Sequence, residues 1–294
     1  MTELPKVSDS YERTLVVRTL ICGLSAGMAV LLYRAPLGDI IAVASRSPDS
    51  SYIFLVPLLV VYLAWLRRSR YRLADFRPSI LGPVFVLASW FLFMTGIAFD
   101  VVVFWHMAFF VALLGIMVSL FGARILSDFV PVIFVAFAAV PIPGSVRNHL
   151  SLPLQSLASE VTAMVLGLVG VPAIRVGNLI EINGVAVAVG EACNGMRLLV
   201  PLGLVIYAFV FSLPLKPITR VILIGCSIPV ALACNVVRLV PTSLAYGYLP
   251  DHAEFVHDIG GWLMIPIAIA VLLGLLRLVA WLDIPVSRWR LFTA

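Results

Sequence analysis

Residues 101–121 read VVVFWHMAFFVALLGIMVSLF, an apolar run that contains no Asp, Glu, Lys or Arg. A helix of about 20 apolar residues is long enough to cross the hydrocarbon core of a bilayer. Similar runs recur along the chain, which is 62% hydrophobic and 12% charged and has a mean hydropathy of +1.10. The sequence therefore predicts an all-α polytopic membrane protein and excludes a soluble globular one.

These runs predict about eight transmembrane helices, of which the second and the fifth are short. The predicted spans are Val16–Leu32, Tyr52–Leu66, Ile80–Phe99, Val101–Phe121, Phe129–Val140, Leu198–Leu213, Val221–Val240 and Trp262–Leu282. The N-terminal region lacks a small-residue cleavage site of the usual kind, so we expect the first run to be a retained span and not a signal peptide.

The basic residues indicate the orientation of the spans. They cluster in short connectors, which the positive-inside rule places in the cytoplasm: Arg67, Arg68, Arg70, Arg72 and Arg77; Arg124; Lys216 and Arg220; Arg288 and Arg290. With the N-terminus also in the cytoplasm, we expect the connectors at residues 34–51, 141–192 and 241–256 on the outer side of the membrane. The net charge of +5 is thus explained without nucleic-acid binding.

The long outer connector has its own predicted structure. Pro141-Ile142-Pro143 ends the preceding helix, because proline supplies no backbone N–H. Residues 150–169 predict an amphipathic or re-entrant helix. Residues 174–182 and 185–189 alternate with period two around Asn183-Gly184, which predicts a small extracytoplasmic β-hairpin.

Three chemically active residues each adjoin an outer connector. Cys193 precedes the run at 198–213, Arg238 lies near the end of the next run, and His257 opens the last one. We therefore expect a thiol, a guanidinium and an imidazole to meet at one membrane depth. The other cysteines, Cys22, Cys226 and Cys234, lie in or beside apolar runs, where buried thiols are ordinary packing residues.

The surroundings of these residues suit a cysteine nucleophile. A helix N-terminus and a cation four residues on, Arg197, both favour the thiolate of Cys193. Arg238 is a charge within a predicted span, with Asn235 on the same helical face, and can stabilise an oxyanion. His257 can act as general acid or base, and its competitor His252 lies in a polar loop.

Other kinds of site find little support in the sequence. It contains no zinc-protease, nucleophile-elbow or phosphate-loop motif. A metal held by Cys193 and His257 would lack clear third and fourth ligands, although Glu191 and Asp258 are near in sequence. We predict no metal and no cofactor.

The order of these motifs resembles the exosortase/archaeosortase family of multi-spanning cysteine transpeptidases. The matching segments are Ala192-Cys193-Asn194-Gly195, Asn235-Val236-Val237-Arg238 and His257-Asp258-Ile259-Gly260, with Asn194 in place of the commoner Ser. On this basis residues 1–294 form a single membrane domain, with an exosortase-like core over about 130–282 and N-terminal spans over 16–121.

The resemblance implies a sorting activity on the outer face of a bacterial inner membrane. The substrates would be secreted proteins with a C-terminal signal of the PEP-CTERM type, made of a short motif, a helix and a basic tail. Cys193 would form a thioacyl intermediate, Arg238 would hold the oxyanion and His257 would protonate the leaving amine. Supporting roles fall to Asn235, Arg197, Asn194 and Gly195, and substrate contacts to Glu160 and Glu191; an acceptor nucleophile completes the reaction.

Two other functions remain open on the sequence alone. A transporter or polysaccharide-export component would use Arg238 to bind an anionic substrate. It should tolerate Cys193→Ser, whereas the enzyme should not. A glycosyl-transfer polymerase would act on lipid-linked sugars and has no need of a thiol.

Overall fold

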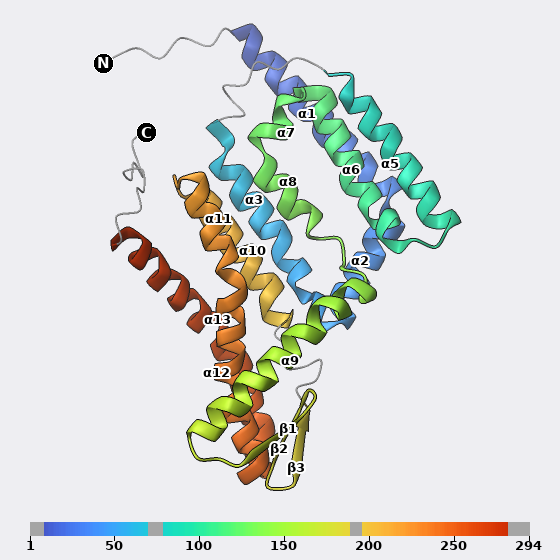
Figure 1. Ribbon diagram of the computed structural model, residues 1–294. Helices are drawn as coiled ribbons and strands as arrows, with labels where there is room; N and C mark the ends of the chain where they lie inside the picture. The colour runs from blue at the N-terminus through green and yellow to red at the C-terminus, as the bar shows by residue number, and fades with distance from the viewer. Residues whose placement is uncertain (1–8, 70–78, 189–195, 282–294) are drawn as a thin grey trace. The chain divides into compact units, whose positions relative to one another are not determined.

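The computed structural model describes residues 9–69, 79–188 and 196–281, which fall into two compact units, Met1–Pro141 and Ile142–Ala294 (Figure 1). Helices dominate both units. Within the described residues, the single β-sheet belongs to the second unit.

The first unit is helical throughout its described part. The first predicted span, Val16–Leu32, lies within the first helix, and a bend of 73° at Tyr33 separates this helix from the next. The elements are α1 (Asp9–Leu32), α2 (Arg34–Arg46), the 3-10 segment η1 (Pro48–Leu55), α3 (Val56–Leu66), α5 (Leu81–Ala98), α6 (Val102–Phe121), α7 (Arg124–Asp128) and α8 (Val130–Phe137).

Glycines bring α5 and α6 into close contact. A Cβ placed on Gly96 would lie 2.6 Å from the backbone nitrogen of Trp105, and one on Gly115 would lie 2.8 Å from Val86. Gly82 lies just as tightly against Ser119. Small residues at such positions allow apolar helices to pack without a water-driven hydrophobic force between them.

The second unit holds the sequence motifs. Its elements are α9 (Gly144–Leu168), β1 (Ala173–Val176), β2 (Leu179–Ile182), β3 (Val185–Ala188), α10 (Met196–Ser212), α11 (Pro217–Gly225), α12 (Ser227–Tyr248) and α13 (Pro250–Trp281). In Figure 1, α12 and α13 run antiparallel, and α9 and the sheet lie beside them.

The predicted hairpin is confirmed, and a third strand precedes it. Asn183 and Gly184 have φ of 53° and 77°, as a type I′ turn between β2 and β3 requires. Gly177, with φ of 63°, starts a second two-residue turn, which divides the expected first strand into β1 and β2. The sheet order is β1-β2-β3, antiparallel throughout.

The predicted amphipathic helix is also confirmed, as α9, and it begins immediately after Pro143. Its polar face is turned inward: Ser151, Gln155, Ser159 and Thr162 are buried. Apolar side chains such as Leu168, 82% exposed, face outward. An outward apolar face of this kind suits contact with lipid.

The predicted count of eight spans is not confirmed. In the described ranges, four helical segments are long and apolar enough to cross a membrane, or five if the bent α1–α2 pair counts as one. The four are Pro48–Leu66, Leu81–Ala98, Val102–Phe121 and Pro217–Tyr248. The fifth predicted span is reduced to the eight residues of α8, and the sixth corresponds to the shorter apolar segment Leu199–Ser212.

The predicted outer connector at residues 241–256 is wrong, because these residues are almost entirely helical. α12 continues through Pro241 to Tyr248, and α13 begins at Pro250, so Leu249 alone joins them. Pro241 removes one backbone hydrogen bond from the helix interior. The Thr242 hydroxyl donates to the Arg238 carbonyl oxygen at 2.8 Å and gives that turn a further bond. Arg238 therefore lies within a helix, well before its end.

Candidate active site

Arg238 is buried in the α12–α13 hairpin, with only 6% of its surface exposed. Its side chain lies over Gly260 of α13, where an added Cβ would be 3.1 Å from Arg238 Cγ. A Cβ on the neighbouring Gly261 would be 3.9 Å from Arg238 Nη2. The two glycines thus make room for a long charged side chain between two closely packed helices.

The guanidinium of Arg238 contacts the imidazole of His257. Arg238 Nη2 lies 2.9 Å from His257 Nε2. Arginine can only donate a hydrogen bond, so Nε2 is the acceptor and the imidazole in this contact is neutral, with its proton on Nδ1. The pair therefore joins a permanent cation to a nitrogen that can take up a proton.

The hairpin geometry explains why these two residues meet. Arg238 lies ten residues before the end of α12, and His257 lies seven residues after the start of α13. Each is therefore on the order of 10–15 Å from the Leu249 turn, at 1.5 Å per residue. The sequence predicted that they would share a depth, and the structure places them in direct contact.

Further polar residues follow the same face of α12. Asn235 is 1% exposed and Thr242 is 1% exposed. Residues three and four positions apart on a helix lie next to each other, so Asn235 and Thr242 flank Arg238. Burial of polar groups in an apolar bundle is costly unless they are hydrogen-bonded. Their presence on this face of α12 therefore makes it a candidate for a functional site.

The remaining predicted site residues have different positions. Cys193, Asn194, Gly195 and Glu191 lie outside the described residues, and Arg197 begins the first turn of α10. Cys234, which we expected to be a packing residue, is buried in the apolar core formed by α10 to α13.

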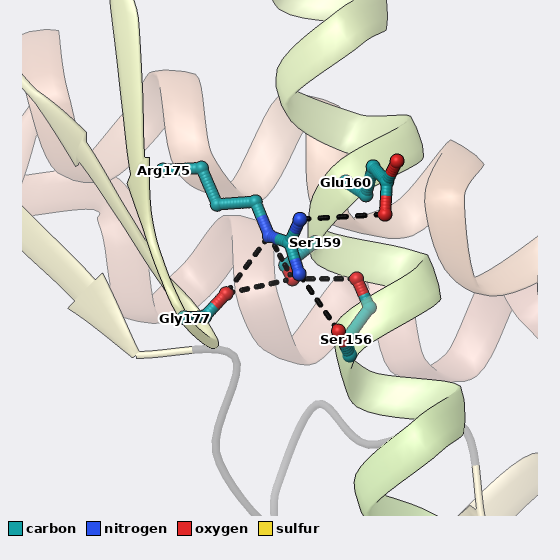
Figure 2. A network of polar contacts seen from close by, with 5 residues as sticks. All are labelled: Ser156, Ser159, Glu160, Arg175 and Gly177. Carbon is teal, nitrogen blue, oxygen red and sulfur yellow. Dashed lines mark hydrogen bonds and ion pairs between the residues drawn. The ribbon is translucent and has the colours of Figure 1, made fainter.

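Glu160 belongs to a polar network that ties the sheet to α9 (Figure 2). Arg175 of β1 lies at its centre. Its Nη2 donates to Ser156 Oγ at 2.7 Å, its Nη1 pairs with Glu160 Oε2 at 3.3 Å, and its Nε lies 2.9 Å from the Gly177 carbonyl oxygen and 3.2 Å from Ser159 Oγ. A bond from Asn178 to Gln155 at 3.0 Å adds to this network. We call these six residues and Gly177 the sheet clasp.

Sequence analysis missed the sheet clasp and one other polar contact. Arg175 and its partners on α9 are 15 to 19 residues apart, a spacing with no local signature. In the first unit, His106 of α6 is buried and its Nε2 lies 2.9 Å from Asp39 Oδ2 of α2. Only two features of the sequence indicated that pair: a histidine lies within an apolar run, and an aspartate lies in a predicted outer connector.

Across residues 9–69, 79–188 and 196–281, no three side chains of His, Cys, Asp or Glu gather as metal ligands would.

Comparison with known protein families matches residues 44–274 to the model described as transmembrane exosortase (Exosortase_EpsH). The match covers well over half of the 294-residue chain. The chain belongs to the transmembrane exosortase family. A search of curated proteins and a search of solved structures give no match.

Family membership agrees with the resemblance seen in the motifs. Exosortases are membrane-embedded sorting transpeptidases, and the matched region of this exosortase contains the three strands, Arg238 and His257. It also contains Cys193.

Proposed function

We propose that this exosortase cleaves the C-terminal sorting signal of secreted proteins through a thioacyl intermediate on Cys193. The observation that supports this most directly is the buried contact between Arg238 Nη2 and His257 Nε2 at 2.9 Å. A fixed cation beside a neutral imidazole supplies both charge stabilisation and proton transfer, the two functions that acyl transfer requires.

In the first step, the Arg238 guanidinium exchanges its hydrogen bond to His257 Nε2 for one to the carbonyl oxygen of the scissile peptide bond. The freed Nε2 lone pair takes the proton of the Cys193 thiol as the sulfur attacks the carbonyl carbon. The C=O π electrons move to the oxygen, and the Arg238 guanidinium stabilises the resulting oxyanion. A guanidinium suits this role because it keeps its charge at every working pH.

In the second step, the tetrahedral intermediate collapses and the C–N bond breaks. His257 gives its proton to the leaving amine, which departs with the helix and basic tail of the substrate. An acceptor amine or water then gives a proton to His257 and attacks the thioester carbonyl carbon. The C–S bond breaks, and His257 returns that proton to the departing sulfur, which regenerates the Cys193 thiol. A covalent intermediate divides one difficult displacement into two easier ones.

Several residues would support this chemistry. Asn235, on the same face as Arg238, would orient the guanidinium, and Arg197 would favour the thiolate. Asn194 and Gly195 would shape the turn that presents Cys193. Glu160 and Glu191 would contact substrate, and the site would face the outside of a bacterial inner membrane.

The test is a processing assay with single substitutions in the full chain. Cys193→Ala, Arg238→Ala and His257→Ala should each abolish cleavage of a secreted reporter that carries a C-terminal motif, helix and basic tail. Cleavage is measured by the mass of the mature reporter. Intact-mass spectrometry should also detect an acyl adduct that is absent in Cys193→Ala.

A transporter or export component gives the opposite result. Cys193→Ser would then leave the phenotype intact, and Arg238→Ala alone would impair it. Normal reporter processing in Cys193→Ala, with the protein present in the membrane at wild-type level, would overturn the proposal.

A further inference from the structure

The outer edge of β3 is open in the described part of the chain. The sheet order β1-β2-β3 gives β3 one neighbour, β2, and no other described strand pairs with it. The β1 edge differs, because Arg175 and Asn178 bind that side of the sheet to α9.

The register shows which backbone groups face this open edge. Residues that flank a two-residue turn exchange both backbone hydrogen bonds, so Val185 pairs fully with Ile182. The alternation of an antiparallel ladder makes Val187 with Ile180 the next fully bonded pair. The N–H and C=O groups of Ala186 therefore point away from β2, as do those of Ala188.

Natural sheets usually protect such an edge, and β3, although only four residues long, lacks the side-chain and backbone devices that do so. Edge strands are commonly blocked by Lys, Pro, a bulge or an inward-pointing charge. β3 reads Val-Ala-Val-Ala, it has no bulge in its pairing with β2, and Ala186 is exposed. The small, exposed side chain of Ala186 leaves room for another chain to approach the backbone.

The direction of β3 relates this edge to the candidate active site. At the start of β3, Asn183 Nδ2 donates to the Gly247 carbonyl oxygen of α12 at 3.2 Å, and Ile182 packs against Gly247. Further along, Ile180, the partner of Val187, shares an apolar cluster with Leu239, the neighbour of Arg238. β3 thus runs beside α12 (Figure 1), and the contacts of the β2–β3 hairpin follow α12 from Gly247 toward Leu239. Cys193 follows β3 by five residues in the sequence.

We propose that the extended segment of the substrate next to the scissile bond adds to β3 as a fourth strand. Backbone hydrogen bonds to Ala186 and Ala188 would hold it, independently of its side chains, and would direct it along α12 toward Arg238. Strand addition at an open edge is an established mode of peptide recognition. This inference rests on the proposed function, because it names how that site takes its protein substrate.

Proline at position 186 tests the proposal. Ala186→Pro removes an N–H that points outward and leaves the bonds between β2 and β3 in place. Loss of one hydrogen bond, about 1 kcal/mol, corresponds to a roughly five-fold rise in KM with kcat unchanged. The matched control is Ala173→Pro, which removes an outward N–H on the opposite edge, at β1, and should process the reporter like the wild type.

Disulfide trapping gives a second measurement that does not depend on a folded proline variant. Ala186→Cys in a Cys193→Ala background is combined with single cysteines along the substrate segment. Strand addition predicts crosslinks at alternate substrate positions, because strand side chains alternate between faces. Crosslinking without this alternation, together with wild-type KM in Ala186→Pro, would overturn it. The two proposals can fail separately. If the wild type cleaves the reporter and Cys193→Ala does not, the proposed function is supported even when the crosslinks contradict strand addition. If the wild type does not cleave the reporter, the proposed function itself has failed.

Discussion

At the scale of single residues, the position of the Arg238 guanidinium depends on the absence of a side chain at Gly260. The Arg238 stem crosses that glycine, and its Nη2 reaches His257 Nε2 at 2.9 Å. A buried guanidinium needs both a hydrogen-bond acceptor and space, since an unpaired buried charge is strongly destabilising. Gly260 supplies the space and His257 the acceptor.

Gly260→Ala should therefore reduce activity without preventing folding. The new Cβ would lie 3.1 Å from Arg238 Cγ, which forces the side chain to move by a few tenths of an ångström and shifts the guanidinium from His257. Misplaced catalytic groups lose rate steeply, so we expect about a ten-fold fall in kcat of reporter processing. Alanine is also the better helix former, so the helix itself should not weaken.

The matched control lies one residue away. A Cβ at Gly261 would be 3.9 Å from Arg238 Nη2, an ordinary contact, so Gly261→Ala should keep most of the activity. Equal losses in the two variants would show that the Arg238 stem is not the sensitive element.

Sequence patterns predicted the proximity of Arg238 and His257 better than the structure of the chain between them. Arg238 and His257 were predicted to share a depth because each adjoins an outer connector, and the contact at 2.9 Å agrees with this. The helical α12–α13 turn was missed because Pro241 and the polar residues after Leu249 resemble a loop. Helix packing overrode those local preferences.

At the scale of elements, the sheet is fixed to its neighbours on two sides. The sheet clasp holds β1 against α9, and Ile182 packs over Gly247 of α12. The turn at Gly177-Asn178 was missed, because the alternation over residues 174–182 predicts one continuous strand, although Gly followed by Asn suits a two-residue hairpin turn. The sheet clasp was missed as well, because its partners come from elements that only the fold brings together.

Arg175→Ala should loosen the sheet from α9. Ser156, Ser159 and Gly177 would each lose the group that donates to them, at a cost of about 1–3 kcal/mol to the docking of the sheet. Hydrogen exchange of the amides in β1 to β3 should accelerate, while exchange in α5 and α6 stays unchanged. Arg175→Lys should be intermediate, because an ammonium cannot reproduce the guanidinium fork.

Arg124→Ala is the matched control for a surface arginine. Its pair with Asp128, at 3.6 Å and with 70% of the arginine side chain exposed, is a solvated i, i+4 contact that contributes little. The rate of hydrogen exchange at the amides of β1 to β3 should not change in this variant. If hydrogen exchange in the sheet is also unchanged in Arg175→Ala, the docking of the sheet on α9 does not depend on the sheet clasp.

Gly247→Ala tests the other attachment of the sheet. Its Cβ would lie 2.6 Å from Ile182 Cγ2, too close without a shift of the sheet away from α12. We expect lower thermal stability in detergent and slower reporter processing. Gly203→Ala in α10, where no atom lies within 4 Å of the added Cβ, should be neutral or slightly stabilising.

At the scale of the whole molecule, the apolar surfaces of the helices require a membrane, and the charges orient it. Trp90 of α5, Leu58 of α3 and Leu168 of α9 are each more than half exposed, as expected for side chains that face lipid. The basic connectors predict which ends of the helices lie in the cytoplasm. The same prediction puts the sheet on the outer side, where its backbone groups could meet water or a substrate.

Cysteine labelling in intact cells tests this orientation. In a background without native cysteines, Ile174→Cys on the outward face of β1, at a position 63% exposed, should react with a membrane-impermeant maleimide before lysis. Lys216→Cys, exposed in a basic connector, should react only after permeabilisation, because that connector is predicted to be cytoplasmic. The reverse pattern would place the sheet, and with it the β3 edge beside α12, on the cytoplasmic side. No secreted substrate could then reach Arg238 and His257 from outside, so the labelling result decides whether the proposed site is on the side that its substrates require.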